Sequence, residues 1–279
     1  MNDDKVWGKW LIISLVILYT GILILGPIIA LVLGAFNRGL TPVLNTLVSS
    51  AFLEALWLSL KIALMVVAIQ AVLGTVVAWI IVRHDFWGKY FLKSIIDVPF
   101  AMSPVVVGYM LLLLFGRNGF LNPVVEPLRI KVAFAPPGIF LATLFVSLPF
   151  MVKEMIPVIE NLDRSQEHAA QTLGASGWTI FQRVIFPQLR TAMIYGMTLT
   201  FARALGEFGA VLVIGGGIQG RTETATMYIF RSLDERYYVE AYSAAIMLGS
   251  FSVMIVLIAD WVKRREERQR LREEIEERI

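Results

Sequence analysis

Hydrophobic and polar positions follow one another along this chain in long blocks. Six blocks are long and apolar: residues 11–36, 62–82, 98–115, 132–152, 191–214 and 241–259. A helix needs about 20 apolar residues to cross a bilayer core of roughly 30 Å. The strict alternation of a membrane β-barrel strand is missing from these blocks. The pattern therefore predicts an all-α membrane protein with six spanning helices in one bundle.

Composition agrees with a membrane setting. Charged residues make up 17% of the 279 positions and hydrophobic residues 57%, whereas soluble domains are about 25% charged. The mean hydropathy is +0.69. The first block carries no charge over residues 11–36, which is longer than the apolar core of about 7–15 residues in a signal peptide. We therefore expect a retained first helix.

The distribution of basic residues predicts the orientation. With the N-terminus in the cytoplasm, 16 of the 25 Lys and Arg residues lie in cytoplasmic segments and 7 in external loops. Cytoplasmic loops carry the excess of basic residues in membrane proteins, so both termini are expected inside. This bias rests partly on the tail, residues 263–279, which is expected to form a charged cytoplasmic helix after a transmembrane domain of residues 1–262. The tail is either a solvated helix end or a surface that docks on a neighbouring subunit.

The fifth block contains two ionisable residues, Arg203 and Glu207, which share one helix face. Ionisable residues inside a membrane usually face the bundle interior or a water-filled cavity. Two interpretations stay open, a structural ion pair and a lining of an anion path. Nearby glycines allow close helix approach or a break in the helix, which makes them further path or gate candidates: Gly206, Gly209, Gly215 and Gly216.

The polar segment 153–190 is the longest predicted cytoplasmic loop. Asp163 or Ser165 is suited to cap a helix start. The two alanines at 169–170 have small side chains, so another protein can approach this helix closely, and Gly174 is suited to end the helix. The apolar stretch that follows leads to a proline, a residue that fits the first turn of the fifth membrane helix. The order predicts a short helix over 163–176 that a second protein docks against.

This segment resembles the coupling loop of ATP-binding-cassette importer permeases, which carries an E-A-A-x-x-x-G pattern followed by I-x-L-P. Here the matching residues are Glu167, Ala169, Ala170 and Gly174, and then Val184, Phe186 and Pro187. The family's acidic position falls on His168, one place after Glu167. In the family this helix couples to a cytoplasmic ATPase. The resemblance therefore implies that role for Glu167, His168, Ala169, Ala170, Leu173, Gly174 and Ala175.

The resemblance extends over residues 51–257. Residues 83–108 and 202–217 look like segments of sulfate and molybdate permeases, and residues 218–230 are more similar to the sulfate branch of the CysW type. The resemblance implies a type I importer permease that forms half of a path for sulfate or thiosulfate. It implies a second permease chain (CysT-type in a heterodimer), two ATPase subunits and an extracytoplasmic sulfate-binding protein in a bacterial inner membrane.

Other classes of function fit less well. The chain has no cysteine and two histidines, and it has no Walker-type glycine loop, H-E-x-x-H or G-x-S-x-G motif. We therefore expect no catalysis, no metal and no cofactor in this chain, with ATP and Mg²⁺ held by the partner ATPase. A homodimeric molybdate or tungstate permease is the first alternative. A secondary anion transporter that needs no ATPase is a remote one.

Overall fold

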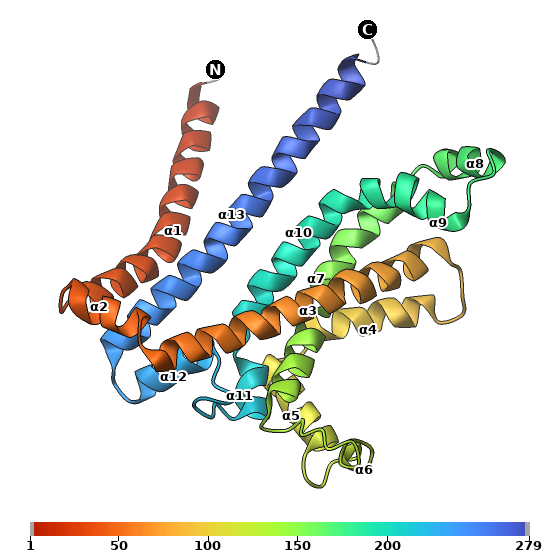
Figure 1. Cartoon of the computed structure of the whole chain (residues 1–279). Coiled ribbons are helices and arrows are strands. Elements are labelled where there is room, and N and C mark those ends of the chain that lie inside the picture. Colours follow the sequence, from red (N-terminus) through yellow and green to blue (C-terminus); the bar gives the residue numbers. More distant parts are fainter. Residues whose placement is uncertain (1–2, 277–279) are drawn as a thin grey trace.

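The computed structural model describes the backbone of residues 3–276 and the side chains of residues 9–261, 264 and 265. Every regular element in residues 3–276 is a helix. Four helices are long and apolar enough to cross a membrane: α1 (Asp3–Phe36), α3 (Ser50–Arg83), α7 (Pro136–Glu160) and α13 (Tyr238–Glu276). These match the first, second, fourth and sixth predicted spans (Figure 1). α1, α3 and α13 extend beyond the predicted bounds, whereas α7 begins four residues later than predicted and ends eight residues later.

The third predicted span is not one helix. α4 (Lys89–Ala101) and α5 (Pro104–Phe115) meet at an angle of 111°. The break lies at Ser103, whose backbone is extended, because a residue that precedes a proline is disfavoured in the helical region. Pro99 lies inside α4 and does not break it. If this pair and the bent fifth pair each count as one span, the total is six.

The fifth span begins earlier than the proline suggested. α9 (Gly177–Ile180), a π-helical turn η1 (Phe181–Ile185) and α10 (Phe186–Leu205) run on without a break. The π turn ends two residues before Pro187, a residue without a backbone N–H to donate. After Leu205 the chain bends by 58° into α11 (Gly209–Gly215). The predicted continuous span over 191–214 is therefore broken close to Glu207.

Short helices occupy the two ends of the bundle. α8 (Arg164–Thr172) lies at the same end as both chain termini, as an even number of crossings requires (Figure 1). α2 (Leu40–Leu47) and α12 (Ala225–Asp234) lie at the opposite end, and α6 (Asn122–Val125) follows α5. The hydropathy pattern did not predict α2, α6 or α12, because none of them is an apolar block of spanning length.

The charged tail is not separate from the last span, because α13 continues without interruption to Glu276. In the sequence, the apolar residues 271, 275 and 279 recur every four positions along the tail and predict a narrow seam, which lies outside the described side chains. Asp97 lies inside α4, and its Oδ1 is 2.7 Å from the Nζ of Lys153 on α7.

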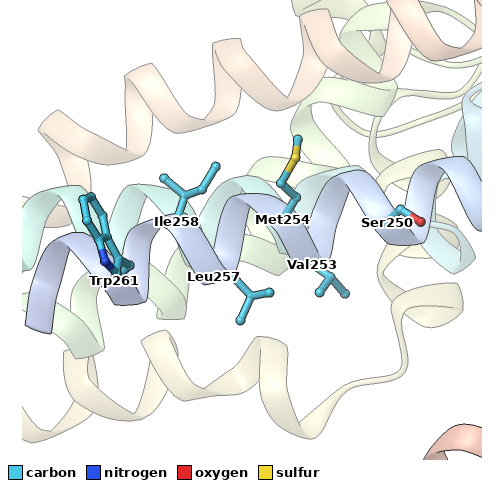
Figure 2. A pocket seen from close by; sticks show the side chains of 6 residues that line it. All are labelled: Ser250, Val253, Met254, Leu257, Ile258 and Trp261. Atoms are coloured by element: carbon cyan, nitrogen blue, oxygen red, sulfur yellow. The ribbon is translucent and has the colours of Figure 1, made fainter.

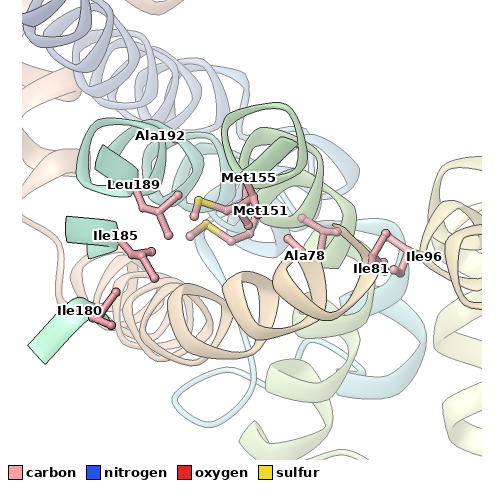
Figure 3. Close-up of a cluster of buried hydrophobic side chains, with 11 residues drawn as sticks. Ala78, Ile81, Ile96, Met151, Met155, Ile180, Ile185, Leu189 and Ala192 are labelled. Carbon is pink, nitrogen blue, oxygen red and sulfur yellow. The ribbon is translucent and has the colours of Figure 1, made fainter. Parts of the chain in front are cut away.

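The core of the bundle lies between α3, α7 and α10, which pack against one another. Its largest cluster also takes in α4, α9 and η1, near the end that carries α8 (Figure 3). The side chains at its centre are fully buried, with Met151, Met155 and Ile159 from α7 and Leu189 from α10. α1 lies apart from this core: it contacts α13 and α2, and its most apolar stretch has no buried side chain.

Candidate functional site

α8 is a short helix with a complete set of caps. At its start, the backbone N–H of Ser165 donates to Asp163 Oδ1 over 2.8 Å. The Ser165 hydroxyl is 2.5 Å from Asp163 Oδ2, and these bonds hold the pKa of the Asp163 carboxyl below its ordinary value. At its end, Gly174 has φ of 80°. The N–H groups of residues 174 and 175 bond back to residues 171 and 170, which is a Schellman motif.

The surface of α8 is open to a partner. No residue of α8 is buried. His168, Ala169 and Gly174 are exposed, and Leu173 is 88% exposed. Ala170 and Ala175 face the other way, where they pack against the large cluster of Figure 3. The helix is therefore fixed to the bundle on one side and presents an uncovered, small-residue surface on the other.

Two polar contacts tie α8 to the bundle. Glu167 forms an ion pair with Arg83 at the end of α3, and Gln188 of α10 donates to Gln166 over 3.1 Å. The seven predicted coupling residues thus form one continuous feature, residues 167–175. The sequence did not single out Arg83, which lies 84 positions from Glu167, because no local pattern marks a contact over that separation.

The break between α10 and α11 is built around Glu207, which is 2% exposed. Its Oε1 accepts from the backbone N–H of Ala210 over 3.1 Å, which caps α11. Its Oε2 is 2.8 Å from Arg203 Nη1. Its backbone oxygen accepts from the Thr226 hydroxyl of α12 over 2.8 Å. Glu207 therefore joins α10, α11 and α12.

Arg203 differs from Glu207 in exposure, because its side chain keeps 27% of its surface accessible. The nearby glycines allow close packing of α11: an added Cβ at Gly209 would lie 3.1 Å from Val105, and one at Gly215 would lie 3.1 Å from Ile139. Gly206 follows the last residue of α10, and Gly216 ends α11 in the left-handed region. The break lies at residues 206–208, and α11 ends at Gly215.

The coupling residues and the path candidates do not meet. They lie on different elements, α8 and the α10–α11 break, and the large cluster of Figure 3 lies near the α8 end of α10. Among the described residues, no group of three His, Asp or Glu side chains is placed to hold a metal ion. Nothing in either place provides an arrangement for bond-breaking chemistry.

A polar groove of about 780 Å³ opens at the end opposite α8, between α1–α2 and α12–α13. Its cationic side chains are Arg38, Arg231 and Arg236, with Asn45 and Tyr237 beside them. Hydrogen bonding to Glu223 is the main reason that the pKa of Arg231 lies above its ordinary value. Arg38 and Arg236 are exposed. The sequence did not predict this groove, which combines segments about 200 positions apart.

A second groove, of about 500 Å³, is apolar and runs along α13. Figure 2 shows its lining, which comes from one helix: Ser250, Val253, Met254, Leu257, Ile258 and Trp261. With no charged group in it, this surface is suited to contact with lipid tails or with another apolar helix. It offers no site for an anion.

Comparison with known proteins identifies relatives of this chain. Residues 70–270 match the family described as binding-protein-dependent transport system inner membrane component. The chain is 42% identical to sulfate permease 2, chloroplastic, of Chlamydomonas reinhardtii over 92% of this chain and 70% of that protein. It is 38% identical to the sulfate transport system permease protein CysW of Escherichia coli K12, over 97% of this chain and 93% of that protein.

The fold also has a solved counterpart. A chain in the crystal structure of a bacterial ABC transporter involved in the import of the acidic polysaccharide alginate superposes with a TM-score of 0.77. The match covers 94% of this chain and 98% of that chain, at 18% sequence identity. At that identity the likeness shows a shared fold, which is the all-helical fold of an importer permease.

Proposed function

Since the chain belongs to the family of binding-protein-dependent transport system inner membrane components, we propose that it is the sulfate permease subunit of an ATP-driven importer. The family makes it a multi-pass inner membrane transport component and not an ATP-hydrolysing subunit. The choice of sulfate is supported by the printed names of the two relatives, both of which are similar over more than nine-tenths of this chain. Thiosulfate has a charge and shape similar to those of sulfate and is proposed as a second substrate.

The observation that carries the coupling mechanism is the exposure of α8. A fully capped helix without one buried residue, fixed at the end of a membrane bundle, is suited to a groove on another protein. We assign that groove to two cytoplasmic ATP-binding-cassette subunits, which bind ATP and Mg²⁺ so that this chain needs no cofactor. Residues 167–175 then transmit closure of the ATPases to α3 and α10.

Two more partners complete the proposed complex. A second permease chain, of the CysT type in a heterodimer, forms the other half of the path. The exposed apolar surfaces of α1 and α13 are long enough to contact both this second permease chain and lipid. A soluble sulfate-binding protein docks outside, where the polar groove with Arg38 and Arg236 faces if both termini lie in the cytoplasm. Along the path, the partly exposed Arg203 weakly attracts the anion, because strong binding would slow its release.

Uptake by vesicles that contain this chain and its co-expressed partners tests the proposal. We expect ATP-dependent uptake of radiolabelled sulfate that unlabelled thiosulfate blocks and molybdate leaves unchanged. Molybdate or tungstate transport in place of sulfate would keep the importer fold and overturn the proposed substrate. Sulfate uptake that persists without ATPase subunits would contradict the ATP-driven mechanism and favour a secondary transporter.

A further inference from the structure

The contact between Arg83 and Glu167 joins the two elements that a coupling motion must connect. Arg83 is in the last turn of α3, and Glu167 is in the first turn of α8. Arg83 Nη2 and Glu167 Oε1 form the ion pair. Resting on the function proposed above, we propose that Arg83 is a positioning residue, which clamps the coupling helix to α3 so that the two move together.

Burial distinguishes this ion pair from the others at the same end of the molecule. The Arg83 side chain is 8% exposed and that of Glu167 19% exposed. The neighbouring pair of Lys89 and Asp85 includes a carboxyl that is 98% exposed. Charge-assisted hydrogen bonds strengthen where water is excluded, whereas exposed ion pairs contribute little. The Arg83–Glu167 contact is therefore the stronger of these two ion pairs.

The guanidinium of Arg83 also contacts an aromatic ring on its own helix. Its Cζ lies 4.9 Å from the ring centroid of Trp79, one turn earlier on α3, in the range of a cation–π contact. Its Nε is buried and has no hydrogen-bond partner, so this cation relies on Glu167 and the indole ring. Loss of Glu167 would leave a buried charge poorly compensated, which disfavours separation of α8 from α3.

α3 is suited to carry the motion across the membrane. From Ser59 to Arg83 the helix rises roughly 36 Å at 1.5 Å per residue. The Ser59 hydroxyl accepts from the backbone N–H of Ala225 at the start of α12, over 2.8 Å. The next residue, Thr226, donates to the backbone of Glu207. One packed helix thus contacts α8 near one end and, through α12, the α10–α11 break near the other.

The test uses the full complex in proteoliposomes and compares Arg83→Gln, Glu167→Gln and the charge swap Arg83→Glu with Glu167→Arg. Because the chain has no cysteine, spin labels at Gln171→Cys on α8 and Val72→Cys on α3 report the distance between the helices by pulsed electron paramagnetic resonance. The second readout is the amount of sulfate imported per ATP hydrolysed. Asp85→Asn, which breaks the exposed neighbouring pair, is the matched control.

We expect both single variants to broaden the distance distribution and to lower sulfate import per ATP by roughly tenfold, while ATP hydrolysis continues. The charge swap should recover much of both, and the control should match the parent. The inference is overturned if import per ATP is unchanged in Arg83→Gln, or if the charge swap is no better than the single variants. If the parent complex imports no sulfate, the proposed function fails, and the distance distributions still test the clamp.

Discussion

Replacement of Glu207 by alanine should be the most destabilising single substitution at the α10–α11 break. The carboxylate is 2% exposed. Its removal deletes the cap on the Ala210 N–H, which lies 3.1 Å from Oε1, and leaves Arg203 without its partner at 2.8 Å.

The size of the effect follows from these contacts. Removal of one partner from a buried ion pair costs 3–5 kcal/mol, and we take about 3 kcal/mol because the Arg203 side chain is 27% exposed. Loss of the helix cap adds about 1 kcal/mol. A total of about 4 kcal/mol corresponds to a fall in Tm of roughly 10 °C for a chain of this size. Glu207→Gln keeps an acceptor for the cap and should lose about half as much.

The assay is thermal unfolding of the purified chain in detergent, followed through the intrinsic fluorescence of its 7 tryptophans. Glu235→Ala is the matched control, because Glu235 pairs with Arg231 at the same i,i+4 spacing but is 43% exposed. Its Tm should change by about 2 °C or less, since a surface pair contributes 0–1 kcal/mol. A Glu207→Ala variant that unfolds no earlier than Glu235→Ala would refute the reasoning.

Three further predictions follow from the same contacts. Gly174→Asp should abolish sulfate uptake with little change in Tm, because an added side chain meets no atom there and aspartate tolerates positive φ. Gly39 has equally open surroundings and φ of 90° but lies at the end of the bundle opposite α8, so the Gly39→Asp variant should take up sulfate normally. Gly108→Ala should lower Tm, because its Cβ would lie 2.5 Å from a backbone oxygen of α11, whereas Gly26→Ala meets nothing within 4 Å and should leave Tm unchanged. Folding lowers the pKa of Asp163 below its ordinary value of 3.8, so the cap formed by Asp163 stabilises α8 fully above pH 3.8 and is lost as the pH falls through the lower pKa of the folded state. An increase in the mobility of a spin label on α8 at a pH above 3.8 would contradict this.

The sequence predicted most of what hydrophobicity controls. Long apolar blocks gave the four continuous spans, and the caps of α8 followed from Asp163 and Gly174, because both act through backbone groups a few residues away. The bend at residues 206–208 was placed less well. A run of apolar residues has the same hydropathy whether its helix is straight or bent.

The contacts that build the candidate sites were not visible in the sequence. Arg83 and Glu167 are 84 positions apart, and Ser59 and Ala225 are 166 apart. Such pairs depend on how the helices pack, and no local pattern encodes them. For the same reason the sequence left Glu207 open between a structural and a path role, and it could not show the hydrogen bonds that join this residue to α11 and α12.

The central claim is that α8 is the surface on which an ATPase subunit docks. A photo-crosslinking amino acid at Leu173, which is 88% exposed on that surface, tests it directly in the assembled complex. Phe120, which is 84% exposed and precedes α6 at a distance from α8, is the control position (Figure 1). The account predicts a crosslink to the ATPase from position 173 and none from 120. No ATPase adduct at 173, or equal adducts at both positions, would contradict it.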